Sequence, residues 1–402
     1  QENSKKMRPD FLKYQAQTSP HPLGLEISKA KGCYIYDTDN NKYLDFVAGV
    51  SANTLGHGHP NIVSAVKKQA AMYMHVMVYG EFVQEAPLKL CKILADHLPK
   101  TLNCVYLTNS GTEATEGALK LAKRVTGRHE IIAAHNAYHG NTQGAMSVCG
   151  KEEQNRAFRP LIPGTEFIEF NNLADLNRIT NKTAAVILET IQGGAGLIEP
   201  VNDYFVQVKK KCEQMGALFI LDEIQTGIGR TGKLFGFENY GVVPDMVITG
   251  KGLGGGMPIG AFISSHKHMN LLKDHPKLGH ITTFGGHPVI AAAGLATIET
   301  LLNSSLMEAS LEKEQLIRKL LVHESIGEIR GRGLMLALIL KNKELTDKVV
   351  LGALQEGFVL YLAVPLVCKG RVKGVLEVFN RTAFSPDQDW LAYLDMMAGQ
   401  AA

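Results

Sequence analysis

Residues 219–260 read FILDEIQTGIGRTGKLFGFENYGVVPDMVITGKGLGGGMPIG, and two short apolar runs in this region are each followed by an ionisable residue. The run at 217–221 stops at Asp222, and the run at 246–249 is followed, after one glycine, by Lys251. Short, unbroken apolar runs predict strands that are buried on both faces, as in a parallel sheet. Ligands bind at the carboxyl ends of such strands. We therefore expect Asp222 and Lys251 to lie at one ligand-binding edge of a parallel sheet.

A carboxylate and an amine at such an edge suit a particular kind of cofactor. Together they can serve a group with a basic ring nitrogen and an aldehyde, which is pyridoxal 5'-phosphate (PLP). The acid would keep the pyridine protonated, and the lysine would form a Schiff base with the aldehyde. On residue types alone, a solvated or paired surface couple is the more common explanation of an Asp and a Lys at strand ends.

The size and composition of the chain predict a soluble globular α/β protein with two domains. It has 402 residues, and single cores stop growing near ~250–300 residues. The net charge of +3 is too small to indicate a nucleic-acid partner. The longest apolar run, at 358–368, is far shorter than the ~20 residues of a membrane helix, and the first residues lack the apolar centre of a signal peptide. The six cysteines include no CxxC pair, so we expect free thiols, a cytoplasmic location and no membrane partner.

The first sixty residues contain no motif that predicts a catalytic or metal-binding site. The segment up to about residue 25 suggests an extended arm, and the alternation at 34–46 predicts a β-hairpin. GHGHP at 56–60 holds two histidines, but no further ligands stand at metal spacing. We interpret it as a helix start with Pro60 at the first position, and we predict no metal.

Three later segments repeat the pattern of a strand followed by polar or small residues. After the strand predicted at 104–108 come Gly111 and Thr112, at the start of a predicted helix. A helix N-terminus can bind a phosphate, although Ser-Gly-Thr before a helix is also ordinary capping. A second strand leads to Tyr138, and a third ends at Glu189.

In these segments the chain resembles the class III PLP-dependent aminotransferases, the group of the ornithine, acetylornithine and 4-aminobutyrate aminotransferases. The resemblance covers roughly residues 25–359. It implies fold type I, an α/β fold with a large domain built on a mostly parallel sheet and a smaller α+β C-terminal domain. The motifs that carry it are LGHGHP at 55–60, NSGTEA at 109–114, ETIQGGAG at 189–196, DEIQTGIGRTG at 222–232, TGKGLGGGMPIGA at 249–261 and TTFGGHP at 282–288.

The resemblance assigns a role to each matched residue. Lys251 would be the Schiff-base amine and then the base that moves a proton, and Asp222 would hold the pyridinium. Thr283 would reach the phosphate of a neighbouring subunit, which implies a homodimer with shared active sites. Cofactor contacts would be made by Gly111, Thr112, Tyr138, Glu189, Gln225 and Thr283.

The implied activity is transfer of an amino group from an amino acid or ω-amino donor to a 2-oxo acid. Two alternatives remain at this point. The chain could be an aminomutase or lyase of the same family, since relatives catalyse those reactions. It could instead bind PLP with little activity, because a substrate-binding Arg expected before a PPL motif near the C-terminus is absent.

The sequence also departs from the family pattern around the substrate. Asn141 stands where many members have an Arg, and Thr190 replaces a Pro. Gly194 occupies the place of a Glu in ornithine-type members, which argues against a strict ornithine δ-aminotransferase. The donor and the acceptor are therefore not determined by the sequence.

We expect three parts in the chain. Residues 1–50 would form an N-terminal arm and hairpin that pack with the small domain. Residues 51–290 would form the large PLP-binding domain, and residues 291–402 the small domain. Within the latter, 360–402 resemble the end of a GAF domain, with a β-hairpin, a helix cap and an amphipathic helix. This tail either fills the place of the small domain's last strands and helix or was joined from another source.

Overall fold

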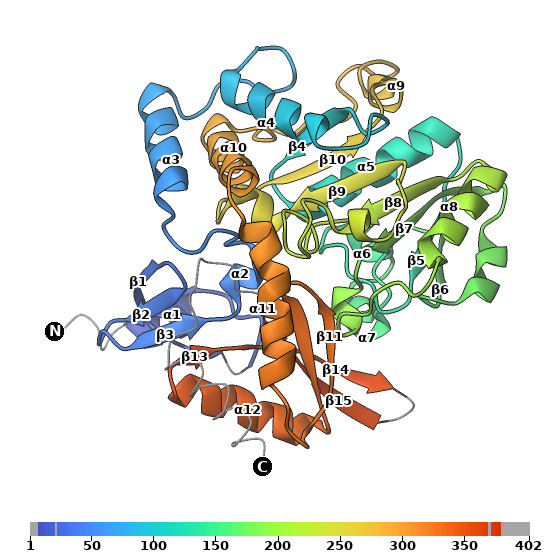
Figure 1. The fold of residues 1–402 in the computed structure, drawn as a ribbon. Coiled ribbons are helices and arrows are strands. Elements are labelled where there is room, and N and C mark those ends of the chain that lie inside the picture. The colour runs from blue at the N-terminus through green and yellow to red at the C-terminus, as the bar shows by residue number, and fades with distance from the viewer. Residues whose placement is uncertain (1–6, 21, 369–370, 379–402) are drawn as a thin grey trace.

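The computed structural model describes residues 7–20, 22–368 and 371–378, and its largest element is a seven-stranded sheet (Figure 1). The sheet is parallel from β9 through β8, β7 and β5 to β6, while β10 runs antiparallel to both β4 and β9. The prediction of an α/β fold with a mostly parallel sheet is confirmed. In spatial order, the strands are β4 (Cys104–Thr108), β10 (Gly260–Ser264), β9 (Met246–Gly250), β8 (Leu218–Asp222), β7 (Thr183–Glu189), β5 (Glu130–Ala134) and β6 (Thr165–Ile168).

The central strands are buried on both faces, as their apolar runs predict. Every residue of β7, β8 and β9 is buried. Alternate residues of β8 enter different core clusters, because successive side chains of a strand point to opposite faces. Ile220 packs with side chains of α5 (Gly111–Thr126), whereas Phe219 belongs to the cluster on the other face. That second cluster is completed by α4 (Glu85–Asp96), α8 (Tyr204–Met215) and α10 (Pro288–Leu302).

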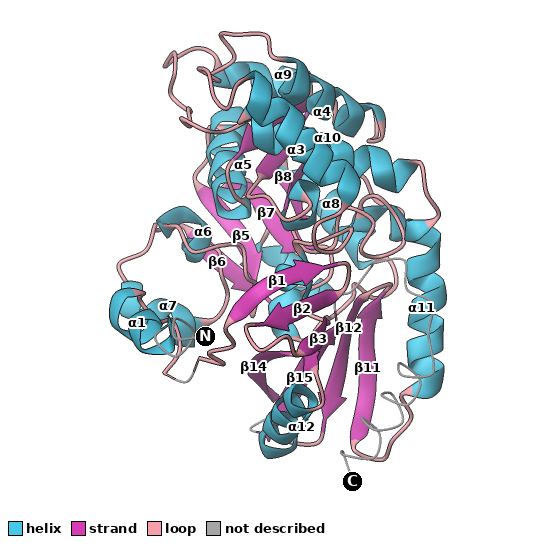
Figure 2. Ribbon diagram, turned by 90° about the vertical axis from the view of Figure 1, so that its left-hand side faces the viewer, coloured by secondary structure: helices cyan, strands magenta, loops and turns pink. Residues whose placement is uncertain are grey.

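A small second sheet joins the N-terminal hairpin to a segment more than 300 residues later in the chain. The predicted hairpin is present as β2 and β3, and β13 pairs in parallel with β3. Leu44 and Phe46 lie in one core cluster with Leu336 and Leu360. Figure 2 shows these strands beside the C-terminal sheet. The sheet consists of β1 (Ile27–Lys31), β2 (Tyr34–Asp37), β3 (Lys42–Asp45) and β13 (Phe358–Val359).

The C-terminal sheet contains the hairpin that was predicted in the tail. Its order is β11-β12-β15-β14, and every neighbouring pair is antiparallel. Because β15 pairs with β12, the hairpin completes this sheet and does not form a separate unit. The predicted helix cap and amphipathic helix lie beyond residue 378, outside the described residues. The strands are β11 (Ile326–Arg332), β12 (Met335–Leu340), β14 (Tyr361–Cys368) and β15 (Arg371–Val378).

The remaining helices connect and flank these sheets. α3 begins at Pro60, as predicted, but residues 7–14 form a helix where an extended arm was expected. No residue of that helix is buried. These helices are α1 (Met7–Tyr14), α2 (Ala48–Ser51), α3 (Pro60–Met72), α6 (Gln143–Ser147), α7 (Glu152–Asn155), α9 (His266–Met269), α11 (Leu306–Leu320) and α12 (Lys343–Gln355). The 3-10 turns are η2 (Arg156–Phe158), η3 (Leu173–Arg178), η4 (Gly193–Ala195), η5 (Gly236–Asn239), η6 (Lys251–Gly254) and η7 (Asn270–Leu272).

The described residues show neither a single membrane-spanning helix nor a metal-binding cluster. No single helix in the described part of the chain has the length and apolar character to cross a membrane. By length and composition alone, α10 and α11 together could do so, as a pair of helices bent relative to each other. The described His, Cys, Asp and Glu residues form no group of three or more that could hold a metal ion.

Candidate active site

Three neighbouring strands of the large sheet deliver ionisable residues to one edge. β7 ends at Glu189, β8 ends at Asp222, and Lys251 directly follows β9. In the ladder, Glu189 is the register partner of Asp222, and Asp222 is the register partner of Ile248. A cavity of about 500 Å³ lies at this edge, and the three ionisable residues line it. The carboxyl ends of the strands therefore form one site, as is typical of parallel α/β sheets.

Seven of the eight candidate residues line this cavity. The exception is Thr283, which is exposed in the segment before α10 and is not among the lining residues. Lys251 has a φ of 40°, a left-handed backbone conformation that non-glycine residues rarely adopt and that is common at functional sites. The seven residues that line the cavity are Gly111, Thr112, Tyr138, Glu189, Asp222, Gln225 and Lys251.

Asp222 is held by a histidine that the sequence analysis did not assign. His139 Nδ1 lies 2.7 Å from Asp222 Oδ2, and both side chains are buried. The other carboxylate oxygen of Asp222 accepts the backbone N–H of Ile224 at 2.9 Å. Burial opposes protonation of His139, but the hydrogen bond and charge of Asp222, aided by Glu189, outweigh it and raise the His139 pKa. The only local signal for this residue is its position directly after Tyr138.

Glu189 is oriented by backbone groups on either side of the cavity. Its carboxylate accepts the N–H of Tyr138 and the N–H of Gly193, each at 3.1 Å. Burial raises the pKa of Glu189 to about 7, against the opposing effect of His139. Gly193 brings the chain close to Gln225: a Cβ there would lie 2.7 Å from the side-chain oxygen of Gln225, which would have to move. Glu189 thus links the Tyr138 loop to the turn after β7.

The neighbouring acid, Glu223, faces away from the cavity. It is fully buried, it is not among the lining residues, and it accepts four hydrogen bonds. The donors are the hydroxyls of Thr190 (2.5 Å) and Thr226 (2.7 Å) and the backbone N–H groups of Gly236 and Phe237 (2.7 Å each). Burial raises the Glu223 pKa to about 7 although all four hydrogen bonds lower it. Thr190, which replaces a family Pro, therefore has a structural partner.

The N-terminus of α5 opens on the same cavity. Ser110 caps this helix by accepting the N–H of Glu113, and the Thr112 hydroxyl bonds to that of Thr142 at 2.8 Å. The N–H groups at the start of a helix have no intrahelical partners and favour anions. A Cβ at Gly111 would lie 2.7 Å from the end of the Ile224 side chain, so glycine lets the helix start and Ile224 pack closely without a shift of that side chain. Gly111 and Thr112 therefore offer backbone donors for a phosphate.

The chemical types of these residues fit PLP, and so does their position around one cavity. Lys251 provides an amine for an aldehyde, the buried Asp222–His139 pair provides a negative charge for a pyridinium nitrogen, and the start of α5 provides phosphate donors. The Tyr138 ring supplies an aromatic surface at the same cavity. Two further polar lining residues, Lys151 and Gln154, had no signal in the sequence, because neither belongs to a strand end or to a matched motif.

Comparison with known proteins identifies the family of this site. The family model "Aminotransferase class-III" matches residues 14–373. An acetylornithine aminotransferase of Caldanaerobacter subterraneus is 39% identical, with 83% of this chain and 85% of the relative covered. A [LysW]-aminoadipate semialdehyde/glutamate semialdehyde transaminase of Sulfolobus acidocaldarius is 37% identical, with 78% and 81% covered. These relatives are transaminases by name, and nothing in the comparisons favours the aminomutase, lyase or low-activity alternative.

Solved structures agree with the sequence comparison. An ornithine aminotransferase of Toxoplasma gondii superimposes with a TM-score of 0.87 at 27% identity, covering 98% of this chain and 93% of that one. A second structure of that enzyme, with PLP at its active site, has a TM-score of 0.87 at 28% identity and covers 98% and 92%.

The comparisons also correct the expected end of the resemblance. The family model continues to residue 373, past the predicted limit of 359, and a GAF-like tail is not confirmed. Together with the pairing of β15 with β12, this places the described part of the tail within the family fold. The chain belongs to the class III aminotransferase family and is a PLP-dependent aminotransferase.

Proposed function

We propose that the enzyme takes its amino group from a donor whose reacting amine is remote from a carboxylate, an ω-amino acid, and passes it to a 2-oxo acid. The observation that carries this proposal is the cavity at the ends of β7, β8 and β9, where Lys251, Asp222 and the start of α5 meet. The relatives named for acetylornithine and for a semialdehyde support the donor class.

In this proposal the chemistry centres on one amine. When bound, PLP supplies an electron sink for the charge that develops on the donor carbon. Lys251 would hold the cofactor aldehyde through Nζ and, once the donor amine takes that place, would be the base that moves a proton between the donor carbon and the cofactor. Lys251 directly follows β9 and has a positive φ. This supports the role, because a buried strand end holds the backbone from which the side chain projects.

The remaining residues hold and polarise the cofactor. Asp222 would hold the ring nitrogen in its protonated form, and His139, whose Nδ1 lies 2.7 Å from Asp222 Oδ2, holds that carboxylate in place. Gln225 would donate a hydrogen bond to the cofactor's ring hydroxyl, and Glu189 fixes the loop that carries Tyr138, whose ring would offer the cofactor an aromatic surface. Gly111 and Thr112 bind the phosphate through their backbone N–H groups. These assignments follow from the family motif and are supported by the shared cavity.

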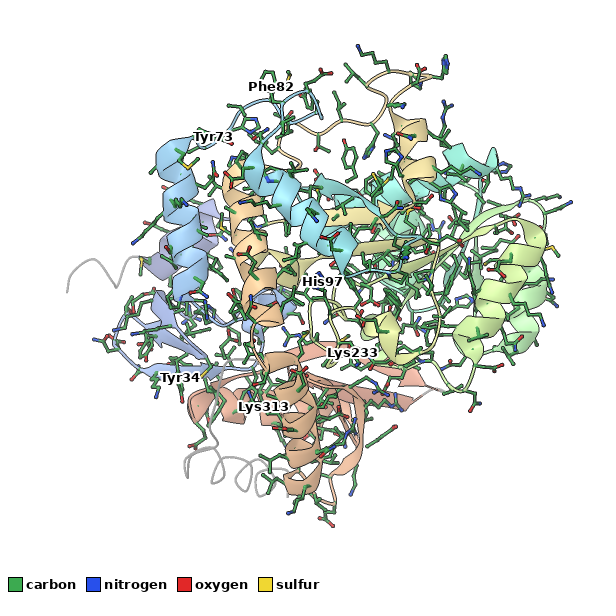
Figure 3. The ribbon with its side chains drawn as sticks, turned by 45° about the horizontal axis from the view of Figure 1, so that its top comes forward. Tyr34, Tyr73, Phe82, His97, Lys233 and Lys313 are labelled. Carbon is green, nitrogen blue, oxygen red and sulfur yellow. The ribbon has the colours of Figure 1, made fainter. Side chains whose placement is uncertain are left out.

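The same proposal includes a homodimer in which Thr283 serves the partner's phosphate site. Thr283 is exposed on the subunit and is not among the residues that line its own cavity. An apolar surface also lies around the segment after α3, and Figure 3 shows Tyr73 and Phe82 at the outer edge of the molecule. Exposed apolar patches of this kind favour association. Its large exposed side chains include Met72, Met74, Val76, Met77, Phe82 and Val83.

We also propose the domain division and cellular location expected from the sequence. Residues 51–290 would form the cofactor domain and 291–402 the small domain, with 1–50 packed against the latter; α10, which spans the boundary, packs in the core of the large sheet. The shared core of Leu44 with Leu336 and the pairing of β3 with β13 support this division. The five described cysteines are free, which supports a reducing cytoplasm.

The visible absorption spectrum of the purified protein tests the assignment of Lys251. Wild-type protein loaded with PLP should show a band from the lysine-bound cofactor, and Lys251→Ala should lack it. A panel containing N-acetylornithine, ornithine, 4-aminobutyrate and alanine would then identify the donor by the loss of that band. Bleaching by alanine but by none of the ω-amines would contradict the proposed donor class. A band that persists in Lys251→Ala would contradict the role of Lys251.

A further inference from the structure

The histidines of the GHGHP segment at 56–60 have no role in the proposed chemistry, yet His57 contacts a buried acid. His57 Nε2 lies 2.8 Å from Asp45 Oδ2, and Asp45 is 3% exposed. The backbone of His57 exchanges two hydrogen bonds with Gly32: the His57 N–H donates at 2.7 Å, and the His57 carbonyl accepts at 2.9 Å. His57 therefore holds one oxygen of the Asp45 carboxylate from a fixed backbone position.

The other oxygen of Asp45 holds the start of a strained turn. Asp45 Oδ1 accepts the N–H groups of Val47 at 2.9 Å and Ala48 at 3.0 Å. All four residues of α2 then have φ angles between 50° and 67°, so α2 is a left-handed turn. Three of them, Ala48, Val50 and Ser51, are not glycine, and their Cβ atoms make this conformation unfavourable. Such a turn persists only where its surroundings hold it.

The segment after the turn contacts the backbone next to Lys251. The Thr54 hydroxyl donates to the carbonyl of Gly252 at 2.9 Å, and both residues are buried. Gly252 directly follows Lys251 in η6. A Cβ at position 252 would clash with Thr54 Oγ1 and would lie 3.3 Å from the carbonyl oxygen of Ser51. The turn and the start of η6 therefore pack in direct contact.

We propose that the Asp45–His57 pair holds the left-handed turn in place and, through Thr54, positions the backbone from which Lys251 projects. Neither member of the pair is among the residues that line the cavity, so both are positioning residues. This inference rests on the proposed function, in which Lys251 would hold the cofactor aldehyde. Without the pair, the strained turn would be populated in only a fraction of molecules, and Lys251 would be correctly placed in that fraction alone.

Two forms of the cofactor separate the positioning of Lys251 from general damage to the site. PLP carries the aldehyde, whereas pyridoxamine 5'-phosphate has an amine in its place and cannot react with Lys251. After PLP-free protein is mixed with PLP, we expect the band of the lysine-bound cofactor to appear roughly 10- to 100-fold more slowly in His57→Leu than in wild type, the range for a small misplacement. Calorimetry should show an unchanged affinity for pyridoxamine 5'-phosphate.

Two further variants at the same segment serve as controls. His57→Gln keeps an N–H group that can donate to Asp45, so it should retain most of the wild-type rate of PLP capture. His59 is the other histidine of the segment, and its buried Nδ1 has no hydrogen-bond partner among the described residues. His59→Leu should therefore capture PLP at the wild-type rate.

Relief of the backbone strain should compensate for loss of the pair. Ser51→Gly removes one Cβ from the left-handed turn, and the buried Ser51 hydroxyl has no hydrogen-bond partner among the described residues. In the double variant His57→Leu/Ser51→Gly, we expect PLP capture to recover by at least about three-fold, because glycine adopts a positive φ without steric cost. Asn202→Gly is the control, at an exposed residue with a φ of 51° outside the turn, and should give no recovery.

Hydrogen exchange of the PLP-free protein tests the pair without any cofactor. The amides of Ser51 and Asn53 donate to carbonyls within the turn, at 3.2 Å and 2.9 Å. In His57→Leu they should exchange at least about ten-fold faster than in wild type or His59→Leu, and a peptide covering 250–256 should also exchange faster. Equal exchange in the three proteins would overturn the inference.

The remaining outcomes are equally decisive. An equal loss of PLP capture and of pyridoxamine 5'-phosphate affinity in His57→Leu would overturn the inference, because the site as a whole would then be damaged. If His57→Leu does not fold, Thr54→Val is compared with Thr54→Ser, which keeps the hydroxyl, and wild-type PLP capture by Thr54→Val would overturn the inference. If wild type forms no band that depends on Lys251 while exchange changes as expected, the proposed role of Lys251 fails and the positioning of its backbone stands.

Discussion

Two consecutive buried acids, Asp222 and Glu223, stand at the end of β8, and they have different partners on the two sides of that strand end. On the cavity side, Asp222 is paired with His139 at 2.7 Å. On the opposite side, which we call the turn side, Glu223 accepts two hydroxyls and two backbone N–H groups. Asp222 is 5% exposed and Glu223 is completely buried. Similar burial therefore accompanies a carboxylate that lines the cavity in one case and a carboxylate that stabilises the turn in the other.

The difference lies in what the partners can do. An imidazole can present a donor or an acceptor at Nδ1 by changing its tautomer, so His139 can adapt when the charge of Asp222 changes. The N–H groups of Gly236 and Phe237 can only donate, so each oxygen of Glu223 has to accept one N–H in either protonation state, and a proton on Glu223 can be donated only to the hydroxyl of Thr190 or Thr226. Substitutions on the cavity side should therefore reduce activity strongly and stability little. Substitutions on the turn side should reduce stability strongly and activity little.

The largest expected effect is on the cavity side. Asp222→Asn keeps its shape, and its amide can still bond to His139 in the other tautomer and to the N–H of Ile224. We expect kcat/KM for the best donor to fall about 10²–10³-fold, because a charge that stabilises the transition state is lost. Steady-state kinetics with saturating PLP measure this. Denaturant unfolding should show a change of less than about 1 kcal/mol in the free energy of unfolding. A larger loss would contradict the expected difference between the cavity side and the turn side.

The matched change on the turn side is Glu223→Gln. Its amide nitrogen has to face one of two fixed donors, the N–H of Gly236 or that of Phe237. We expect the free energy of unfolding to fall by about 2 kcal/mol, the usual cost of an unsatisfied buried polar group. Urea unfolding at pH 8 measures it, with Asp222→Asn as the comparison. Unchanged stability would show that the turn side adapts as well as the cavity side.

A change of pH probes the same carboxylate without a mutation. Burial raises the folded-state pKa of Glu223 to about 7 from 4.5. Between these values the folded protein keeps a proton that the unfolded chain has lost, so the free energy of unfolding falls as pH rises. From pH 5.5 to 6.5 the fall amounts to at most about 1.4 kcal/mol for one such group. Urea unfolding should give a smaller fall in Glu223→Gln; an identical fall would mean that Glu223 does not titrate in this window.

The smallest expected effect concerns the Thr190 hydroxyl. Thr190→Val removes one of the four donors to Glu223 and keeps the side-chain shape. We expect a loss of about 1 kcal/mol in the free energy of unfolding, with kcat/KM within about two-fold of wild type. Thr190→Ser, which keeps the hydroxyl, should recover most of the stability. If kcat falls substantially in Thr190→Val while stability does not, the two sides are coupled through β7.

The elements that could be predicted are those whose signal is local. The apolar runs that became β7, β8 and β9 are short and unbroken, and helices cover both faces of the sheet, so burial follows from the pattern alone. Helix α1 was missed: Pro9 is tolerated in a first helical turn, and Met7, Leu12 and Lys13 favour a helix, but none of its residues is buried. Without a core-facing stripe, its pattern gives no periodic signal.

Local sequence patterns accounted for five of the seven strands of the large sheet, β4, β5, β7, β8 and β9, for the arrival of Asp222 and Lys251 at the carboxyl ends of β8 and β9, and for the family motifs; β6 and β10 were not predicted. These features depend on neighbours a few residues apart, which a pattern records. Only the tertiary structure decided that Asp222 faces the cavity and Glu223 the interior, that His139 pairs with Asp222 from 83 residues away, and that Lys151 stands beside Gly194 on the cavity wall. Those choices depend on which elements pack on either side of one strand end, and successive residues along an extended chain point in opposite directions.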